Sequence, residues 1–296
     1  MSKNTSKTYC FGKADDGNIE FGETYHVALA LGLEPDAKVF VREFKDGEEF
    51  LKLVGFTDRV VFKRPEKSAD LPKTSNIFQE KGKKTHAEAN RIWKTIKAEA
   101  SHEGWAGSIK KLAGFLSRNS TLKILIWLRR SIYKSERNIT EEGILQLIRS
   151  CRNHDLTPLI VGHIPAGWNL SLAGILQLGE FYRHPFFQTN SIAKQLFFLD
   201  WLHSNYSVKA SVGMMSGAMD GLAFFSGRRV IFFEESVDKK KEPTRMNKVT
   251  QTFRQFKRIE LHTPLTKKKA FKSFSLSEQG DLDKYWDEVS KNAKND

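Results

Sequence analysis

Residues 211–235, SVGMMSGAMDGLAFFSGRRVIFFEE, place a Ser-Gly turn in front of a short apolar segment. If VKASVG is a strand and GAMDGLAFF a helix, Ser216 can cap the helix and Gly217 lets a ligand approach the backbone closely. The free N–H groups of such a helix start, together with the helix dipole, favour a phosphate. Asp220, one turn further, could orient the turn or reach a ligand hydroxyl. An ordinary N-cap in an ordinary α/β turn is the alternative.

The next predicted strand, RVIFF, runs into two adjacent carboxylates, Glu234 and Glu235. A carboxylate at a strand end can accept hydrogen bonds from ribose or sugar hydroxyls. A solvated strand exit would have the same composition.

A second predicted strand is followed by arginines. In IWLRRSIYKSERN, residues 126–138, Arg129 and Arg130 come directly after the apolar run, and Arg137 follows in the same loop. Guanidinium groups bind phosphate oxygens in bidentate fashion, although a basic surface loop is also compatible with the pattern. Because ligands bind at the carboxyl ends of parallel strands, these arginines and the Ser-Gly turn are predicted to share one edge of a sheet.

A third segment, FGKADDGNIEFGETYH (residues 11–26), follows the first predicted strand. It contains neither the G-x-G-x-x-G nor the G-x-x-x-x-G-K-[ST] pattern, so a dinucleotide fingerprint or a P-loop is not supported. Asp15, Asp16 and His26 are candidates for a general base, with solvated or structural roles as the alternative. The histidines do not show metal-ligand spacing, and no metal site is expected.

These segments need an α/β scaffold to position them. From residue 121 onward, near-continuous apolar strands alternate with amphipathic helices, which predicts a parallel sheet covered on both faces. In one of these helices Thr140 is the expected N-cap. The N-terminal third repeats the strand–helix alternation, residues 64–86 are predicted as a polar loop, and residues 87–117 as helical.

A boundary near residues 118–120 would divide the chain into two α/β domains, 1–120 and 121–296, which face each other across a cleft. The 296 residues are 40% hydrophobic and suffice for two cores, yet no apolar run approaches the roughly 18 residues of a transmembrane segment. The start of the chain lacks the apolar centre of a signal peptide, and two cysteines make no disulfide framework. We therefore expect a cytoplasmic protein.

The net charge of +13 is concentrated in residues 237–272, which hold twelve Lys or Arg and three Asp or Glu. Such a stretch can attract nucleic acid, an anionic membrane surface or a phosphorylated small molecule, or can be a solvated loop. A nucleic-acid-binding surface would also present aromatic rings for stacking. Phe253 and Phe256 instead have the spacing of a buried helix face.

The arginine segment ILIWLRRS resembles the strand-plus-arginine motif of the fucosyltransferase-like group, the NodZ and protein O-fucosyltransferase enzymes. That motif usually reads His-x-Arg with a second Arg, and Trp127 stands where the pattern has His. The segment 211–235 is similar to the nucleotide-sugar segment of this group and of other GT-B glycosyltransferases. Arg245 falls where related sequences often carry a basic residue. The resemblance covers about residues 121–262.

The resemblance implies two Rossmann-like domains in GT-B style, with the nucleotide-sugar in domain 121–296 and the acceptor on the side of domain 1–120. It further implies a C-terminal helix that packs back across both halves. The expected activity is transfer of a sugar from a nucleotide-sugar donor to an unknown glycan, lipid or protein acceptor, without a metal or other cofactor. Two alternatives are a basic nucleic-acid-binding protein and an inactive GT-B-like scaffold that binds a protein partner.

Overall fold

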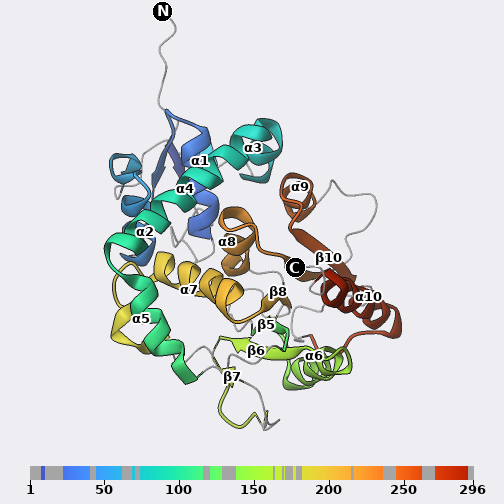
Figure 1. The fold of residues 1–296 in the computed structure, drawn as a ribbon. Coiled ribbons are helices and arrows are strands. Elements are labelled where there is room, and N and C mark those ends of the chain that lie inside the picture. The colour runs from blue at the N-terminus through green and yellow to red at the C-terminus, as the bar shows by residue number, and fades with distance from the viewer. Residues whose placement is uncertain are drawn as a thin grey trace, which may run out of the picture.

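The fold contains two parallel β-sheets, one from each half of the chain, with helices packed around them (Figure 1). The structure is a computed structural model. The residues that it describes are 8–10, 23–40, 45–61, 69–70, 74–115, 121–128, 138–162, 164–168, 170, 176–177, 182–214, 217–235, 245–261 and 271–292.

The smaller sheet has the strand order β3-β2-β1-β4, and every pair in it is parallel. Its strands are β1 (Thr8–Cys10), β2 (Lys38–Phe40), β3 (Val60–Val61) and β4 (Ala69–Asp70). Helices α1 (Glu23–Leu33) and α2 (Lys45–Leu53) connect the first three strands, and a 3₁₀ turn at Thr57–Arg59 precedes β3. The Arg59 guanidinium donates to the carbonyl oxygens of Leu31 and Ala37, at 2.6 and 2.8 Å, and so fixes the end of α1.

The larger sheet is also parallel and has the order β10-β9-β8-β5-β6-β7. Its strands are β5 (Lys123–Trp127), β6 (Thr157–Val161), β7 (Leu176–Gln177), β8 (Val208–Met214), β9 (Val230–Glu235) and β10 (Phe256–Leu261). Its helices are α6 (Glu141–Asn153), α7 (Ser191–Asn205), α8 (Gly217–Phe225), α9 (Arg245–Thr252) and α10 (Leu276–Asn292). The strand order reverses between β5 and β8, which makes their junction the topological switch point of a doubly wound sheet.

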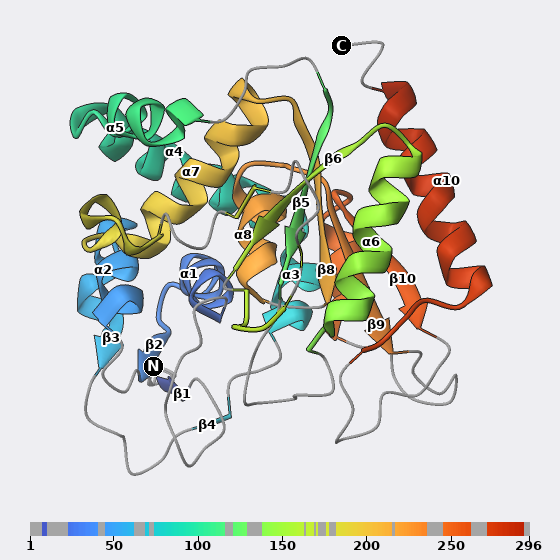
Figure 2. The same ribbon diagram turned by 90° about the horizontal axis from the view of Figure 1, so that it is seen from below.

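The two faces of the larger sheet bury separate apolar clusters, as expected for strands covered on both sides. Figure 2 shows α6 and α10 on one face and α7 and α8 on the other. Along β5, Ile124 and Ile126 belong to the α6–α10 cluster, whereas Leu125 belongs to the α7–α8 cluster. The predicted cap of α6 is confirmed, because the Thr140 side chain accepts a hydrogen bond from the Gly143 N–H at 3.2 Å.

The prediction of a loop over residues 64–86 is wrong. That stretch contains β4, helix α3 (Thr74–Lys81) and the start of α4 (Lys83–His102). Although this stretch is mostly polar, α3 carries two buried side chains, Ile77 and Phe78. They place α3 in the core, where it packs against α9. Residues 87–117 are largely helical as predicted, in α4 and α5 (Trp105–Leu112), followed by a 3₁₀ turn at Ala113–Phe115. Gly104, in the left-handed region at φ 64°, separates the two helices.

The C-terminal helix does not take the expected place across both halves. In the described residues α10 packs against α6 and β10, within the C-terminal half. Leu282, Trp286 and Val289 form its buried face, and the Trp286 indole donates to Ser150 Oγ at 2.9 Å. Burial of this apolar face against α6 and β10 keeps the helix on the larger sheet.

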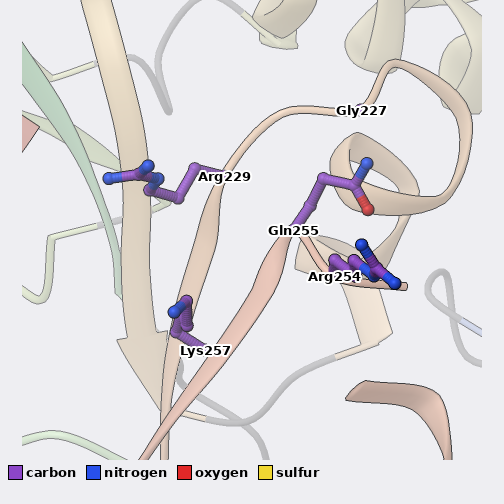
Figure 3. Close-up of a pocket in the computed structure, with 5 residues that line it drawn as sticks. All are labelled: Gly227, Arg229, Arg254, Gln255 and Lys257. Carbon is purple, nitrogen blue, oxygen red and sulfur yellow. The ribbon is translucent and has the colours of Figure 1, made fainter. Parts of the chain in front are cut away.

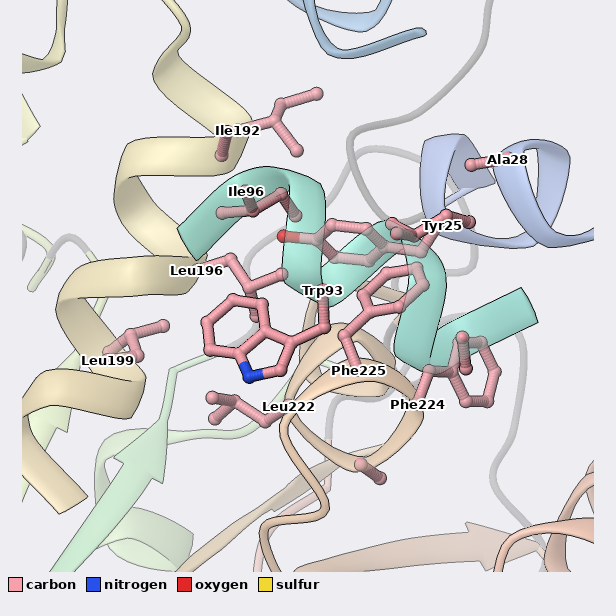
Figure 4. Packing of buried hydrophobic residues seen from close by; sticks show 14 of the residues in the cluster. Tyr25, Ala28, Trp93, Ile96, Ile192, Leu196, Leu199, Leu222, Phe224 and Phe225 are labelled. Atoms are coloured by element: carbon pink, nitrogen blue, oxygen red, sulfur yellow. The ribbon is translucent and has the colours of Figure 1, made fainter. Parts of the chain in front are cut away.

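One continuous core joins the two halves. Helices α1 and α4 from the N-terminal half share an apolar cluster with α7 and α8, and the side chains of Tyr25, Trp93, Leu196 and Phe225 converge there (Figure 4). All described strands of the smaller sheet precede residue 120, and all described strands of the larger sheet follow it. The boundary itself stays a prediction, since residues 116–120 lie outside the described part.

None of the described helices is long and apolar enough to cross a membrane.

Histidine 203 should make stability fall in acid. The pKa of His203 in α7 falls from 6.5 to about 3, chiefly because the side chain is buried and also because of the positive charges of Arg228 and Lys209. Below pH 6.5 the unfolded chain therefore binds a proton that the folded chain refuses. We expect the free energy of unfolding to drop by about 1.4 kcal/mol per pH unit between pH 6.5 and 3 from this group alone.

Urea unfolding of the wild type and of His203→Gln at pH 7, 6 and 5 measures this contribution. The variant should lose clearly less stability than the wild type over that range, whatever its own stability at pH 7. Equal losses in the two proteins would show that His203 titrates normally in the folded state.

Candidate active site

The arginine loop and the Ser-Gly turn begin at adjacent strand ends. Strands β5 and β8 are direct neighbours, with Trp127 opposite Gly213 at their carboxyl ends. Residues 129–137 follow β5, and residues 215–216 connect β8 to α8, which starts at Gly217. Arg129, Arg130 and Ser216 lie outside the described residues, so their predicted contacts with a phosphate stay predictions. Chain connectivity nevertheless starts both segments at the switch point of the larger sheet, where α/β proteins bind ligands.

Gly213 allows the close approach of these two strands. A Cβ atom at this position would lie 2.9 Å from Trp127 Cβ and 3.2 Å from Met219 Sδ. The Trp127 indole Nε1 is buried and has no hydrogen-bond partner among the described residues. A buried donor of this kind calls for a polar partner, and this one lies at the strand end that precedes the arginines.

The other two predicted groups of the donor site flank the same edge. Glu234 and Glu235 are the last residues of β9, one position beyond the pairing of Met214 in β8 with Phe233. Arg245 is the first residue of α9, and α9 packs against α3 from the N-terminal half. The backbone thus places Glu234 and Glu235 at the carboxyl edge, and Arg245 on a helix that joins the halves. The contacts of their side chains lie outside what the structure describes.

His26 and Asp220 meet each other in the core. His26 Nε2 lies 2.6 Å from Asp220 Oδ2, and the two side chains are 0% and 6% exposed. His26 belongs to the first turn of α1, and Asp220 to the first turn of α8. The imidazole also stacks on Phe78 and meets the edge of Phe224, at centroid distances of 5.7 and 4.9 Å. A buried polar pair therefore ties together the starts of two helices, one from each half.

Tyr25 and Gly221 make the same junction tight, and the sequence did not single them out. The Tyr25 ring covers Gly221, where a Cβ atom would lie 2.6 Å from Tyr25 Cε2. Burial raises the pKa of Tyr25 above its ordinary range, and the nearby Tyr182 and Asp220 raise it further. The only signal in the sequence is a glycine inside an apolar helix, which is typical of close packing but names no partner.

The contact between α1 and α8 also links two of the predicted segments, residues 11–26 and residues 211–235. Asp15 and Asp16 lie in residues 11–22, between the carboxyl end of β1 and the start of α1, outside the described residues. Both this loop and the Ser-Gly turn lead directly into the helices that the His26–Asp220 pair joins. The two strand-to-helix connections that we predicted to carry chemistry thus end at the same place in the fold.

The basic stretch 237–272 has no stacking aromatics at its described surface. Its phenylalanines, Phe253, Phe256 and Phe271, are all buried. Phe253 and Phe256 are core residues as predicted, but they do not share a helix face: Phe253 follows the end of α9, and Phe256 is the first residue of β10. Among the described residues no cluster of three or more His, Cys, Asp or Glu could hold a metal ion.

No family model matches the chain, and neither does any curated protein sequence. The fold does match a solved structure, the ADP-heptose LPS heptosyltransferase II of E. coli, with a TM-score of 0.52 and 12% sequence identity. The match covers 97% of this chain and 99% of that chain. That enzyme is a GT-B glycosyltransferase, so the chain has the GT-B fold, as the resemblance of residues 121–262 implied. At this identity the likeness shows the fold alone.

Proposed function

We propose that the chain is a glycosyltransferase that moves a sugar from a nucleotide-sugar donor to an acceptor, without a metal ion. The observation that carries this proposal is the convergence of two strand-to-helix connections at the His26–Asp220 junction. In a GT-B fold this is the junction between the acceptor half and the donor half. The structural likeness supports GT-B glycosyltransferases in general. The resemblance to the fucosyltransferase-like group is more specific and therefore stays a prediction.

The proposed reaction involves an acceptor hydroxyl, a donor sugar with its diphosphate, and a general base. An acceptor hydroxyl oxygen forms a bond to the anomeric carbon of the donor sugar, while the bond from that carbon to the diphosphate oxygen breaks. The nucleoside diphosphate leaves, and a general base takes the hydroxyl proton. Arg129 and Arg130 neutralise the charge that develops on the diphosphate, and the start of α8 at Gly217 binds it from the other side. Glu234 or Glu235 accepts hydrogen bonds from ribose or sugar hydroxyls.

Asp15 and Asp16 are the preferred candidates for the base. His26 is fully buried and its Nε2 is bonded to Asp220, so it reaches an acceptor only if the two halves separate. We assign the His26–Asp220 pair to holding α1 against α8. Arg245 is proposed as a further cation for the donor, carried by the helix that contacts α3.

A panel of nucleotide-sugars tests the proposal directly. It should contain UDP-, GDP-, ADP- and CDP-sugars, with ADP-heptose as the donor named for the structural neighbour and a nucleotide-linked fucose for the fucosyltransferase-like resemblance. A specific donor at a hundred times its dissociation constant stabilises the protein by about 2.7 kcal/mol, which thermal unfolding detects. If no donor shifts the melting temperature and duplex DNA binds with steep salt dependence, the nucleic-acid alternative replaces this proposal.

Gly217→Val should abolish donor binding with little loss of stability. Valine can adopt the helical backbone angles at the start of α8, but its side chain would occupy the space that the diphosphate needs next to the N–H groups. Ser216→Ala distinguishes the alternative: if Ser216 is only a helix cap, the variant should lose about 1 kcal/mol of stability and keep its donor affinity. Melting temperature and donor affinity are measured side by side. A folded Gly217→Val protein with normal donor affinity would place the diphosphate elsewhere.

Transfer should continue in the presence of EDTA. Cationic side chains and a helix start stabilise the leaving diphosphate in the proposed site, so no divalent ion is needed. Initial rates with and without the chelator give the measurement. A complete loss of activity that Mn²⁺ or Mg²⁺ restores would contradict the metal-independent mechanism.

A further inference from the structure

A basic pocket lies at the opposite edge of the larger sheet from the proposed donor site. It has a volume of about 260 Å³ and is lined by Gly227, Arg229, Arg254, Gln255 and Lys257. Figure 3 shows these residues on the connections that enter β9 and β10. The connections are held together by the Val230 N–H, which donates to the Gln255 carbonyl oxygen at 2.9 Å. Because both strands start here, the pocket belongs to the amino edge.

Three cationic side chains meet in this pocket with little acidic compensation. Glu288 of α10 lies 3.4 Å from Arg229, as a partly exposed pair. Arg254 and Lys257 have no acidic partner among the described residues. Like charges brought together raise the local potential and attract a counter-ion of opposite sign. The lining thus carries an excess of positive charge that an anionic ligand would neutralise.

The Tyr285 ring holds two of these cations in place. The Arg229 guanidinium lies 6.0 Å from the ring centroid, and Lys257 Nζ lies 5.8 Å from it. Such contacts fix the direction of long flexible side chains and reduce the entropy that ligand binding would otherwise cost. Both cations are therefore oriented before a ligand arrives.

The pocket suits one small anionic group. Pockets for drug-sized ligands usually measure about 300–1,000 Å³, so this one is small for a whole nucleotide-sugar. Arginine forks match phosphate oxygens, and lysine adds a point charge. The Gln255 Oε1 atom is buried without a partner among the described residues, and the hydroxyl of a hydrogen phosphate offers it a donor. A carboxylate would leave that acceptor unmatched.

We propose that this pocket binds a phosphate monoester group, presented either by an anionic lipid or by a soluble phosphorylated compound. The site is distinct from the proposed donor site and does not depend on sugar transfer. Arg254 and Lys257 belong to the basic stretch 237–272, whereas Arg229 lies outside it. The fold, rather than the charge run, therefore assembles the pocket.

The test uses the full chain and two probes at low ionic strength. Radiolabelled inorganic phosphate in equilibrium dialysis measures the soluble ligand. Sedimentation with phosphatidylcholine vesicles, with and without phosphatidic acid, measures the lipid. Arg254→Glu/Lys257→Glu should weaken binding of the responding probe by about tenfold or more, since two attractive contacts become repulsive. The matched control is Lys110→Glu/Lys111→Glu on α5, which makes the same charge change at residues far from the pocket residues in the sequence. It should leave binding within about twofold of the wild-type value.

The outcomes separate the sources of the phosphate. Saturable dialysis binding alone identifies a soluble compound, and phosphatidic-acid-dependent sedimentation identifies a lipid headgroup. Equal weakening in the two double variants would reduce the effect to net charge and overturn the pocket. Absence of binding to either probe by the folded wild type would overturn it as well. Neither readout involves a sugar donor, so the result stands apart from the proposed transferase activity.

Discussion

Asp220→Ala should lower the free energy of unfolding by about 3–5 kcal/mol, the cost of removing one member of a buried polar pair. The carboxylate and the His26 imidazole are 2.6 Å apart and shielded from water by Phe78 and Phe224. Removing either partner leaves the other buried without this hydrogen bond. Urea unfolding at pH 7 measures the loss.

Two further variants give this prediction its controls. His26→Leu/Asp220→Leu removes both polar groups at once and should be far less destabilising than Asp220→Ala, because neither member of the pair stays buried without the other. Glu48→Gln breaks the exposed Glu48–Lys52 pair on α2 and should cost about 0.5 kcal/mol or less. A loss for Asp220→Ala as small as that of Glu48→Gln would mean that the pair does not hold the two halves together.

Arg129→Ala/Arg130→Ala should reduce donor binding or turnover by about a hundredfold or more. Each lost charge-assisted hydrogen bond to a diphosphate costs on the order of 1.5–3 kcal/mol, and the two arginines follow β5 at the switch point of the sheet. We expect the double variant to stay folded while donor binding is lost. Donor titrations by thermal shift and initial rates measure the effect.

Arg149→Ala is the matched control for the arginine clamp. It removes an exposed guanidinium from α6, the helix that follows the same loop in the chain. The variant should leave donor affinity unchanged within error. If the folded double variant binds and turns over the donor normally, the diphosphate is bound by other residues. A result in which Arg149→Ala weakens the donor as strongly would point to the overall positive charge instead.

The sequence indicated the individual elements well where the apolar pattern was regular. The helix GAMDGLAFF, the cap at Thr140 and the strand before the arginine loop are where periodicity and capping placed them. Residues 64–86 were predicted wrongly because Ile77 and Phe78 are too few to outweigh the prolines and charges around them. A short helix with two buried side chains depends on its neighbours for stability, and its sequence carries little signal.

The sequence by itself determined the order of strands and helices and the residues that follow each strand. That order is enough to place Arg129 and Ser216 after strands of one parallel sheet and Glu234 at the end of another of its strands, because connectivity and hydrophobic periodicity are local properties. Only the tertiary structure decided that α10 stays on α6, that a basic pocket forms at the amino edge, and that His26 pairs with Asp220. The last two residues are 194 positions apart in the chain. Their contact depends on how Tyr25 packs against Gly221, and no local pattern encodes the packing of two distant helices.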